Sequence, residues 1–214
     1  MQAVVAPSIE REVPESWHVI KRAIDIGLGL TLLAVAAPIV ALAVVGIVCT
    51  TGGLPFFAQE RVGMNGRRFK MFKLRTMVNG AHKMREDLMH LNEVDGPVFK
   101  IRNDPRLHRL GRFLRRTSID ELPNLVNVVL GDMSLVGPRP ALPCEVEHYD
   151  GFSMRRLSVP QGLTCLWQIN GRSDVSFEEW MVLDGLYVDT WTPLGDLIVI
   201  AQTIPAVLRK DGAH

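Results

Sequence analysis

The run IGLGLTLLAVAAPIVALAVVGIV, residues 26–48, contains no charged side chain. Its 23 residues are enough to cross a bilayer, which needs about 20 apolar residues. Pro38 divides the run. At about 1.5 Å per residue, the arm before it reaches only about 18 Å, short of about 30 Å of hydrocarbon. Because neither arm crosses alone, the sequence predicts a membrane helix that is broken at Pro38 and returns to the face it entered.

Basic residues flank this run on both sides, which bears on its topology. Lys21 and Arg22 precede it. Six more follow it closely, namely Arg61, Arg67, Arg68, Lys70, Lys73 and Arg75. Under the positive-inside rule neither end is marked as the outer one, which favours a re-entrant hairpin over a full span. A straight signal anchor and a buried core helix are the alternatives that these residues leave open.

The remaining length and composition set the domain organisation. The chain has 214 residues, of which 47% are apolar, and this is enough for one domain plus a membrane element. We therefore expect an N-terminal tail over residues 1–20, the re-entrant helix over 21–50 and a compact cytosolic domain over 51–214. The expected fold class is α+β, mostly helical, with short strands and amphipathic helices at the membrane surface.

Charge is unevenly distributed along the chain, although the net charge is only +1. Residues 100–116 contain seven basic side chains against a single acid, Asp104. Such a stretch suits an anionic lipid surface and a phosphorylated substrate. Nucleic acid is the competing partner, but no recognisable nucleic-acid-binding module accompanies the run, so we expect none. The three cysteines lack C-x-x-C spacing and the six histidines are scattered, which argues against zinc.

The segment TSIDELPNLVNVVLGDMSLVGPRP, residues 117–140, places two adjacent carboxylates, Asp120 and Glu121, between an arginine-rich stretch and an arginine clamped by prolines. A carboxylate can attack phosphorus only if the repulsion between the two anions is cancelled by metal ions or fixed cations. The segment therefore predicts a phosphate-handling site.

An ordinary structural interpretation of the same acids stays open. Ser118 and Glu121 have the S-x-x-E spacing of a capping box. Pro123 would then fall inside the first turns, where it removes a donor and its ring clashes. A helix that starts nearer Leu122 avoids this problem and should end at Gly131.

Short-range patterns predict the other elements. Residues 56–63 and 68–75 alternate around Asn65-Gly66, which predicts a β-hairpin. We expect a polar helix over residues 80–92 and a basic amphipathic helix that starts at Asp104-Pro105 and lies either in the headgroup layer or on the core. The capping box that begins at Ser176 predicts a further helix. The apolar segment 194–208 is too short to span a bilayer.

Taken together, these features resemble the bacterial sugar transferase family, the monotopic polyprenyl-phosphate phosphoglycosyl transferases. The resemblance runs from about Lys21 to the C-terminus. It rests on the ordered motifs KRAIDIGLGL, FFAQERVG, FKLRTM, GPVFKIRNDPR, LRRTSIDELPNLVNVVLGDMSLVGPRP, GLTCLWQINGR and LDGLYV. No large multi-span region precedes them, so the chain resembles the minimal catalytic form.

The resemblance implies an enzyme of the bacterial cytoplasmic (inner) membrane, with its catalytic domain on the cytoplasmic face. Such enzymes transfer a sugar 1-phosphate from a nucleotide diphosphate sugar, commonly a UDP-sugar, to polyprenyl (undecaprenyl) phosphate, and so initiate exopolysaccharide or lipopolysaccharide biosynthesis. It implies that Asp120 is the nucleophile and that Glu121 helps to hold Mg²⁺. A covalent aspartyl phosphosugar would let the soluble donor and the lipid acceptor use one site in turn.

The resemblance also implies substrate-binding residues. The candidates for phosphate or nucleotide contacts are Lys73, Arg75, Arg115, Arg139, Arg172 and Asp184. Surface salt bridges remain the alternative for Arg75 and Arg172. The chain departs from the family pattern at Cys165, where glycine is common, and at Ala37-Pro38, where a Ser-Pro pair is common.

Two other functions remain open at this stage. A membrane-anchored glycosyltransferase without a covalent intermediate would share the sugar substrate, although the chain lacks the D-x-D metal motif. A non-catalytic membrane scaffold would explain the apolar run and the basic patches. The sequence does not specify the sugar, the polyprenyl length, the pathway served or the oligomeric state.

Overall fold

A computed structural model describes residues 13–94, 96–99, 101–170 and 176–209. Its first element, α1 (Glu15–Thr51), is one helix of 37 residues, or about 55 Å. It ends at Gly52, which adopts the left-handed conformation with φ 57°. Pro38 lies inside the helix, which continues on both sides of it, and the predicted break and re-entrant path at this residue stay predictions. The helix also starts earlier than residue 21, so part of the expected tail is helical.

The predicted hairpin is confirmed. Strands β1 (Phe56–Val62) and β2 (Arg68–Leu74) pair antiparallel, with Phe56 opposite Leu74. The turn between them passes through Asn65 and Gly66, with φ values of 56° and 78°. A second, smaller sheet pairs β3 (Ser134–Val136) with β4 (Gly162–Thr164) in parallel.

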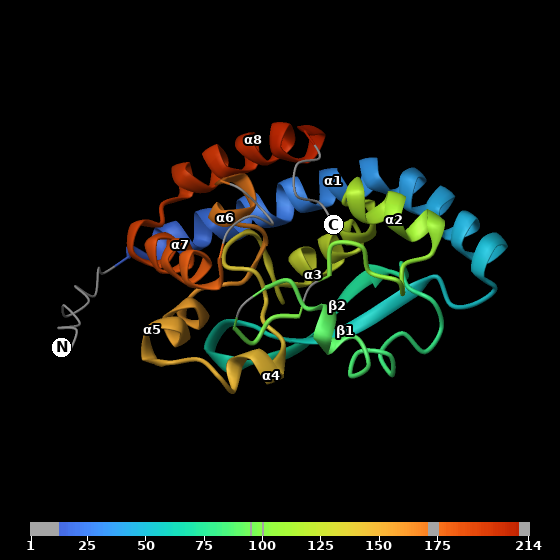
Figure 1. Ribbon diagram of the computed structural model, residues 1–214. Coiled ribbons are helices and arrows are strands. Elements are labelled where there is room, and N and C mark those ends of the chain that lie inside the picture. The colour runs from blue at the N-terminus through green and yellow to red at the C-terminus, as the bar shows by residue number, and fades with distance from the viewer. Residues whose placement is uncertain (1–12, 95, 100, 171–175, 210–214) are drawn as a thin grey trace, which may run out of the picture.

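The other helices lie alongside α1 and the hairpin (Figure 1). The α-helices after α1 are α2 (Arg109–Arg116), α3 (Asn124–Leu130), α4 (Pro143–Val146), α5 (Gly151–Met154), α6 (Leu166–Asn170), α7 (Phe177–Thr190) and α8 (Pro193–Arg209). The 3₁₀ turns are η1 (Met64–Gly66), η2 (Met89–Leu91), η3 (Ile119–Glu121) and η4 (Arg155–Ser158). The capping box at Ser176 is confirmed, since its hydroxyl accepts from the Glu179 N–H and the Glu179 carboxylate accepts from the Ser176 N–H.

Two predicted helices differ from the structure. Residues 80–92 form successive turns that end in η2, because most of these side chains are exposed and no apolar face is buried to stabilise a helix. The basic helix begins at Arg109 rather than at Asp104-Pro105. His108 caps it through Nδ1, which accepts from the Gly111 N–H at 2.9 Å. Asp104 instead binds the guanidinium of Arg106.

Two apolar clusters hold the elements together. The larger one joins α1, β2, α3, β3, α7 and α8, and its buried members are Ala36, Phe69, Met71, Leu125, Val128, Met133, Leu135, Val136, Tyr187, Trp191 and Val199. The smaller one packs Leu114 of α2 and Leu74 of β2 against Ile47 near the end of α1. The apolar face of α2 therefore packs on the protein core. Of the two positions expected from the sequence, the headgroup layer or the core, the structure shows the second.

Polar contacts fasten the first half of α1 to the rest of the domain. The Lys21 Nζ donates to Asp196 Oδ2 at 2.6 Å and to the Val136 carbonyl at 2.9 Å. Asp25 Oδ1 accepts from the Leu135 N–H at 2.8 Å. Arg22 donates to two carbonyls at the end of α3, both at 2.7 Å. Because Lys21 and Arg22 bind other parts of the domain, their charges are weak evidence for the membrane topology of α1. From the sequence alone, these charges looked like topology signals.

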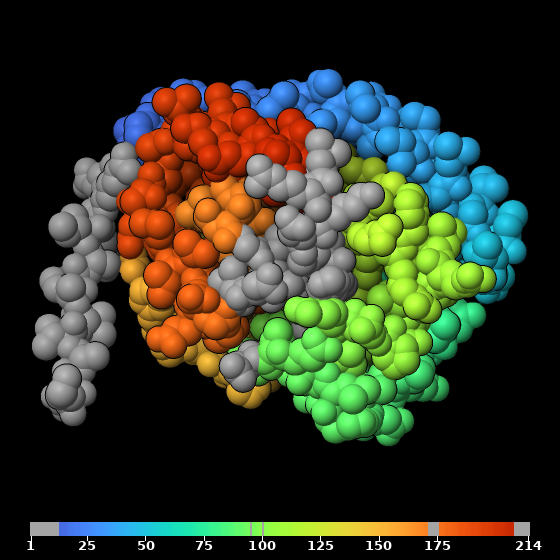
Figure 2. Space-filling model, turned by 45° about the horizontal axis from the view of Figure 1, so that its top comes forward, coloured from blue at the N-terminus to red at the C-terminus, as the bar shows by residue number. Residues whose placement is uncertain are grey.

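The outer face of α1 stays apolar and exposed. Only 11% of its most apolar 18-residue window is buried, so α1 is not a core helix. By length and composition it is the one described helix that is long enough to cross a membrane. Figure 2 shows α8, in red, beside α1, in blue, and α8 also exposes large apolar residues such as Leu194 and Ile204. This mostly helical structure is consistent with a monotopic membrane anchor.

Candidate active site

The acidic pair lies on η3, a single 3₁₀ turn between α2 and α3. Ser118 precedes it with φ 56°, a left-handed conformation that reverses the chain, and its side chain makes no cap hydrogen bond. The capping-box interpretation of Ser118 is therefore wrong. The alternative start is close to the observed one, because Pro123 is the N-cap of α3 and Gly131, with φ 90°, ends the helix.

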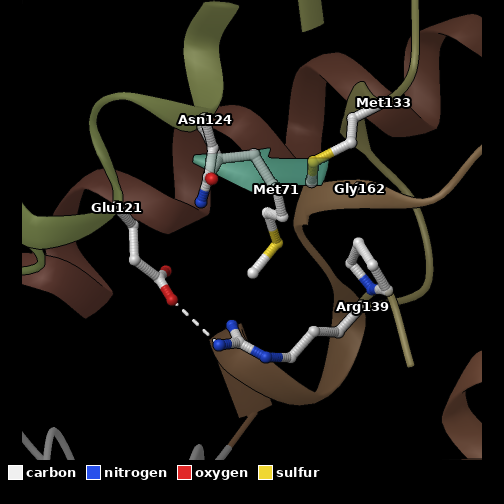
Figure 3. A pocket seen from close by; sticks show the side chains of 8 residues that line it. Met71, Glu121, Asn124, Met133, Arg139 and Gly162 are labelled. Carbon is white, nitrogen blue, oxygen red and sulfur yellow. Dashed lines mark hydrogen bonds and ion pairs between the residues drawn. The ribbon is translucent and has the colours of Figure 1, made fainter. Parts of the chain in front are cut away.

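Two cations hold Glu121 in place. Its Oε1 accepts from Lys73 Nζ at 2.8 Å and from Arg139 Nη2 at 2.9 Å. Figure 3 shows Glu121 and Arg139 pointing toward each other across a pocket that Met71 and Asn124 also line. Burial opposes ionisation of Glu121, but Arg139 and Lys73 outweigh it and hold its pKa well below the usual range. Glu121 is therefore a fixed, ionised carboxylate.

Asp120 has a different environment. It is 7% exposed, and among the described residues no hydrogen bond to its carboxylate is found. Burial and the adjacent charge of Glu121 raise its pKa, while Lys73, Arg115 and Arg139 oppose that rise. The two neighbouring acids thus differ in environment, since Glu121 is engaged by cations and Asp120 accepts no hydrogen bond from the part of the chain that the structure describes.

Arg61 is a site cation that the sequence analysis counted only as a flanking charge. Its Nη1 donates to the Pro140 carbonyl at 2.9 Å. Burial and then repulsion by Arg139 lower its pKa to about 10. Strand alternation could have found it, because in the hairpin Arg61 and Lys73 lie at odd-numbered positions that share one face.

The local charge balance favours an anion. Four cationic side chains act electrostatically on the acidic pair, namely Arg61, Lys73, Arg115 and Arg139. They outnumber the two carboxylates of the pair, which favours an anionic group such as a phosphate at the site. Arg115 donates from Nε to Thr76 Oγ1 at 3.1 Å and contributes its charge to Asp120.

Two of the predicted substrate-binding residues, Arg75 and Asp184, have other surroundings. Arg75 donates to Asn79 Oδ1 at 2.8 Å and to Thr51 Oγ1, so its guanidinium lies at the end of α1 and makes no contact with Glu121. Asp184 is 1% exposed and pairs with Arg156 Nη2 at 2.8 Å. Burial raises its pKa to about 6, against the opposing charge of Arg156. Arg172 lies outside the described residues.

Asn127 is a further residue that the sequence did not single out. Its side chain accepts from the Phe72 N–H at 3.1 Å and donates to the Lys70 carbonyl at 2.8 Å. In this way a fully buried amide on α3 binds the backbone of β2 on either side of Met71. The contact fixes β2 against α3, and therefore fixes Lys73 relative to Glu121.

The donor set is compatible with magnesium. Among the described residues no group of three or more histidine, cysteine or carboxylate side chains could hold a metal ion. Mg²⁺ commonly takes only one or two protein carboxylates and completes its octahedron with waters and substrate phosphates. The adjacent oxygen donors of Asp120 and Glu121 meet that requirement.

Comparison with known proteins extends over nearly the whole chain. Residues 16–210 match the family model described as bacterial sugar transferase. A UDP-galactose-lipid carrier transferase of Erwinia amylovora is 40% identical over 203 residues, which cover 93% of this chain and 42% of that protein. Exopolysaccharide production protein ExoY of Rhizobium meliloti is 37% identical over 198 residues, covering 91% and 88% respectively.

A third relative carries a more specific name. The UDP-glucose:undecaprenyl-phosphate glucose-1-phosphate transferase of Caulobacter vibrioides is 38% identical over 205 residues, which cover 91% of this chain and 72% of that protein. The chain thus spans less than half of the Erwinia protein but most of the Rhizobium and Caulobacter proteins.

Proposed function

The chain belongs to the bacterial sugar transferase family, and on that premise we propose that it transfers a sugar 1-phosphate from a UDP-sugar to undecaprenyl phosphate through a covalent intermediate on Asp120. The observation that carries the proposal is the contrast within the acidic pair. Glu121 is locked by two cations, whereas Asp120 beside it has no hydrogen-bond partner among the described side chains and backbone. The names of related proteins refer to UDP-galactose, UDP-glucose and undecaprenyl phosphate, which supports the choice of substrates.

In the first step a carboxylate oxygen of Asp120 attacks the β-phosphorus of the donor. The new bond is an acyl phosphate ester to the sugar phosphate, and the bond that breaks is the one between the β-phosphorus and the bridging oxygen, which leaves with UMP. Arg139 and Lys73 offset the charge that accumulates on the phosphoryl oxygens. Burial of Asp120 raises the energy of its carboxylate, so the attack relieves an unfavourable buried charge.

In the second step the phosphate oxygen of undecaprenyl phosphate attacks the same phosphorus. The acyl phosphate bond breaks, and Asp120 returns to its free carboxylate as undecaprenyl diphosphate sugar forms. Two displacements at one phosphorus allow the water-soluble donor and the lipid acceptor to occupy the site in turn.

Asp120 and Glu121 would hold the magnesium ion. Bound there, Mg²⁺ would supply Lewis-acid stabilisation of the phosphoryl oxygens. Glu121 offers the oxygen that its two cations do not engage, since both Lys73 and Arg139 donate to Oε1.

The membrane arrangement is part of the proposal. The exposed apolar faces of α1 and α8 would lie in the cytoplasmic leaflet of the inner membrane, with the catalytic domain in the cytoplasm. In the re-entrant arrangement α1 would enter and leave by one face and would bend at Pro38 in the membrane.

Label retention tests the covalent step. Purified full-length protein in detergent receives UDP-galactose or UDP-glucose labelled at the β-phosphate, without acceptor lipid. We expect about one label per protein molecule, release of UMP, and loss of both in Asp120→Asn. Glu60→Gln is the matched control, because Glu60 forms an exposed ion pair with Arg68 at 2.9 Å on the hairpin. Protein that releases no UMP and never carries label with either donor would contradict the proposal.

A further inference from the structure

The turn that carries Arg139 is held almost entirely through its carbonyl oxygens. Pro138 and Pro140 have no N–H group, so the backbone on either side of Arg139 offers few donors. Each of the four carbonyls from residue 138 to 141 nevertheless accepts one hydrogen bond. The donors, in order, are Gly162 N at 2.8 Å, Arg156 Nη2 at 2.6 Å, Arg61 Nη1 at 2.9 Å and Val62 N at 2.9 Å. Two side-chain guanidinium groups therefore supply half of the contacts.

Arg156 is the more deeply buried of these two arginines, with 1% exposure. Its Nη2 also pairs with Asp184 Oδ2 at 2.8 Å, and its Nη1 donates to the Tyr149 hydroxyl. The guanidinium lies over the rings of Tyr149 and Trp180, at 5.5 and 5.3 Å from their centroids. These contacts orient the planar group so that its Nη2 faces the Arg139 carbonyl.

We infer that Arg156, oriented by Asp184, is a positioning residue that holds the Pro138–Pro140 turn so that Arg139 meets Glu121. The inference rests on the proposed function, because it assigns Arg156 to the site that would handle phosphate. Neither Arg156 nor Asp184 needs to touch substrate in this role. Their shared effect is transmitted by one hydrogen bond, from Arg156 Nη2 to the Arg139 carbonyl.

Burial energetics support a functional role for the pair. Removing two charges from water costs several kcal/mol per ion, and apolar side chains of similar volume often stabilise a core at least as well. A guanidinium here provides something that an apolar residue cannot, namely a donor for a carbonyl in a turn flanked by prolines. Its neighbour Arg155 offers a contrast, because Arg155 pairs with Asp189 at the surface and has no contact with the turn.

A double-mutant cycle distinguishes positioning from a general structural role. Full-length wild type, Arg156→Met, Arg139→Met and the double variant are assayed for UMP release from UDP-sugar. We expect Arg156→Met to lower kcat/KM by about 10-fold or more in the wild-type background, but by less than about 3-fold where Arg139 is already replaced. The matched control, Arg155→Met, should stay within about 2-fold of wild type.

A split between kcat and KM gives a second readout that simple loss of stability would not move. If Arg139 shifts, it holds the donor diphosphate less well, so KM for the UDP-sugar should rise in Arg156→Met and stay unchanged in Arg155→Met, whereas loss of folded protein lowers only the apparent kcat. If Arg156→Met gives no cooperative thermal melt, Arg156→Lys and Tyr149→Phe take its place in the same cycle.

The outcomes separate the two proposals. Independent effects in the double variant, with an unchanged KM in Arg156→Met, would overturn the positioning role while leaving the proposed function intact. A wild-type protein that neither releases UMP nor retains label would overturn the proposed function, and the inference with it. Non-additive losses together with a raised KM would support both.

Discussion

Breaking the buried contact between α1 and α8 should unfold the protein at a markedly lower temperature. Asp196 is 3% exposed and accepts from three donors: Lys21 Nζ at 2.6 Å, Tyr187 OH at 2.9 Å and Trp191 Nε1 at 3.0 Å. The substitution Asp196→Asn keeps the volume but removes the charge, so the buried Lys21 ammonium loses its ion-pair partner, and Asp25 remains as a nearby carboxylate that makes no ion pair with it.

The expected loss of stability follows from breaking this buried ion pair. Loss of one partner of a buried ion pair costs about 3–5 kcal/mol. In a chain of this size each kcal/mol lowers Tm by about 2–4 °C, so we expect a drop of about 6–20 °C. The melt is followed by tryptophan fluorescence in detergent, because Trp17 and Trp191 pack edge to face beside this pair with ring centroids 6.1 Å apart.

Two further variants make this prediction specific. The exposed pair of Arg155 and Asp189 is the control, and Asp189→Asn should change Tm by no more than about 3 °C. The double variant Lys21→Met with Asp196→Leu should lose less stability than Asp196→Asn alone, because it removes both members of the ion pair and leaves no buried ammonium without its partner. A shift below about 3 °C for Asp196→Asn, or a double variant that is less stable still, would refute the reasoning.

Three other predictions concern the site and the anchor. Lys73→Met should lower kcat/KM by about 10- to 150-fold, because it removes a charge-assisted hydrogen bond to Glu121, whereas Lys70→Met on the opposite face of β2 should have little effect in the same UMP-release assay. Ser16 and Leu54 are exposed, and each is replaced by a single cysteine in a chain without its native cysteines. Both cysteines should react with an impermeant thiol reagent from the cytoplasmic side of membrane vesicles, and labelling from opposite sides would mean a full span. The pKa of Asp184 is raised to about 6, which means that its carboxyl group holds a proton more tightly in the native state than in the unfolded state. The resulting stabilisation is complete below about pH 4 and is lost as pH rises to about 6. The difference in Tm between wild type and Asp184→Asn should therefore fall over that window, and a constant difference would count against the assignment.

Predictions that depend on neighbouring residues agree well with the structure. The Asn65-Gly66 turn, the capping box at Ser176 and the end of α3 at Gly131 all appear as expected. Each depends on backbone conformations and hydrogen bonds within a few residues, which the local side chains largely determine.

Predictions that depend on distant partners agree less well. Lys21 and Arg22 looked like charges that orient a membrane segment, yet they bind carbonyls and a carboxylate more than 100 residues away. Arg75 is a cation in the same FKLRTM motif as Lys73, but β2 ends at Leu74. The side chain of Arg75 therefore turns away and binds Thr51. Neither outcome follows from spacing, because the partners come from other elements.

Helix α1 continues through Pro38, although proline usually interrupts a helix. A proline inside a helix removes one hydrogen bond and clashes with the preceding turn, which predicts an end or a kink. In α1 the helix continues through Pro38, with Ala36 buried in the larger apolar cluster on one side of it and Ile47 in the smaller cluster on the other. Packing on both sides supports continuity where propensity favours an interruption.

The sequence by itself determined the local chemistry of this protein: an apolar run of membrane length, a tight hairpin turn, and adjacent carboxylates beside a proline-flanked arginine. The tertiary structure decided which charges meet. Glu121 is 48 residues from Lys73 and 18 from Arg139, and it binds both. Ion pairing acts over a few ångströms, so only the packing of β2, η3 and the turn after β3 could bring these side chains into contact.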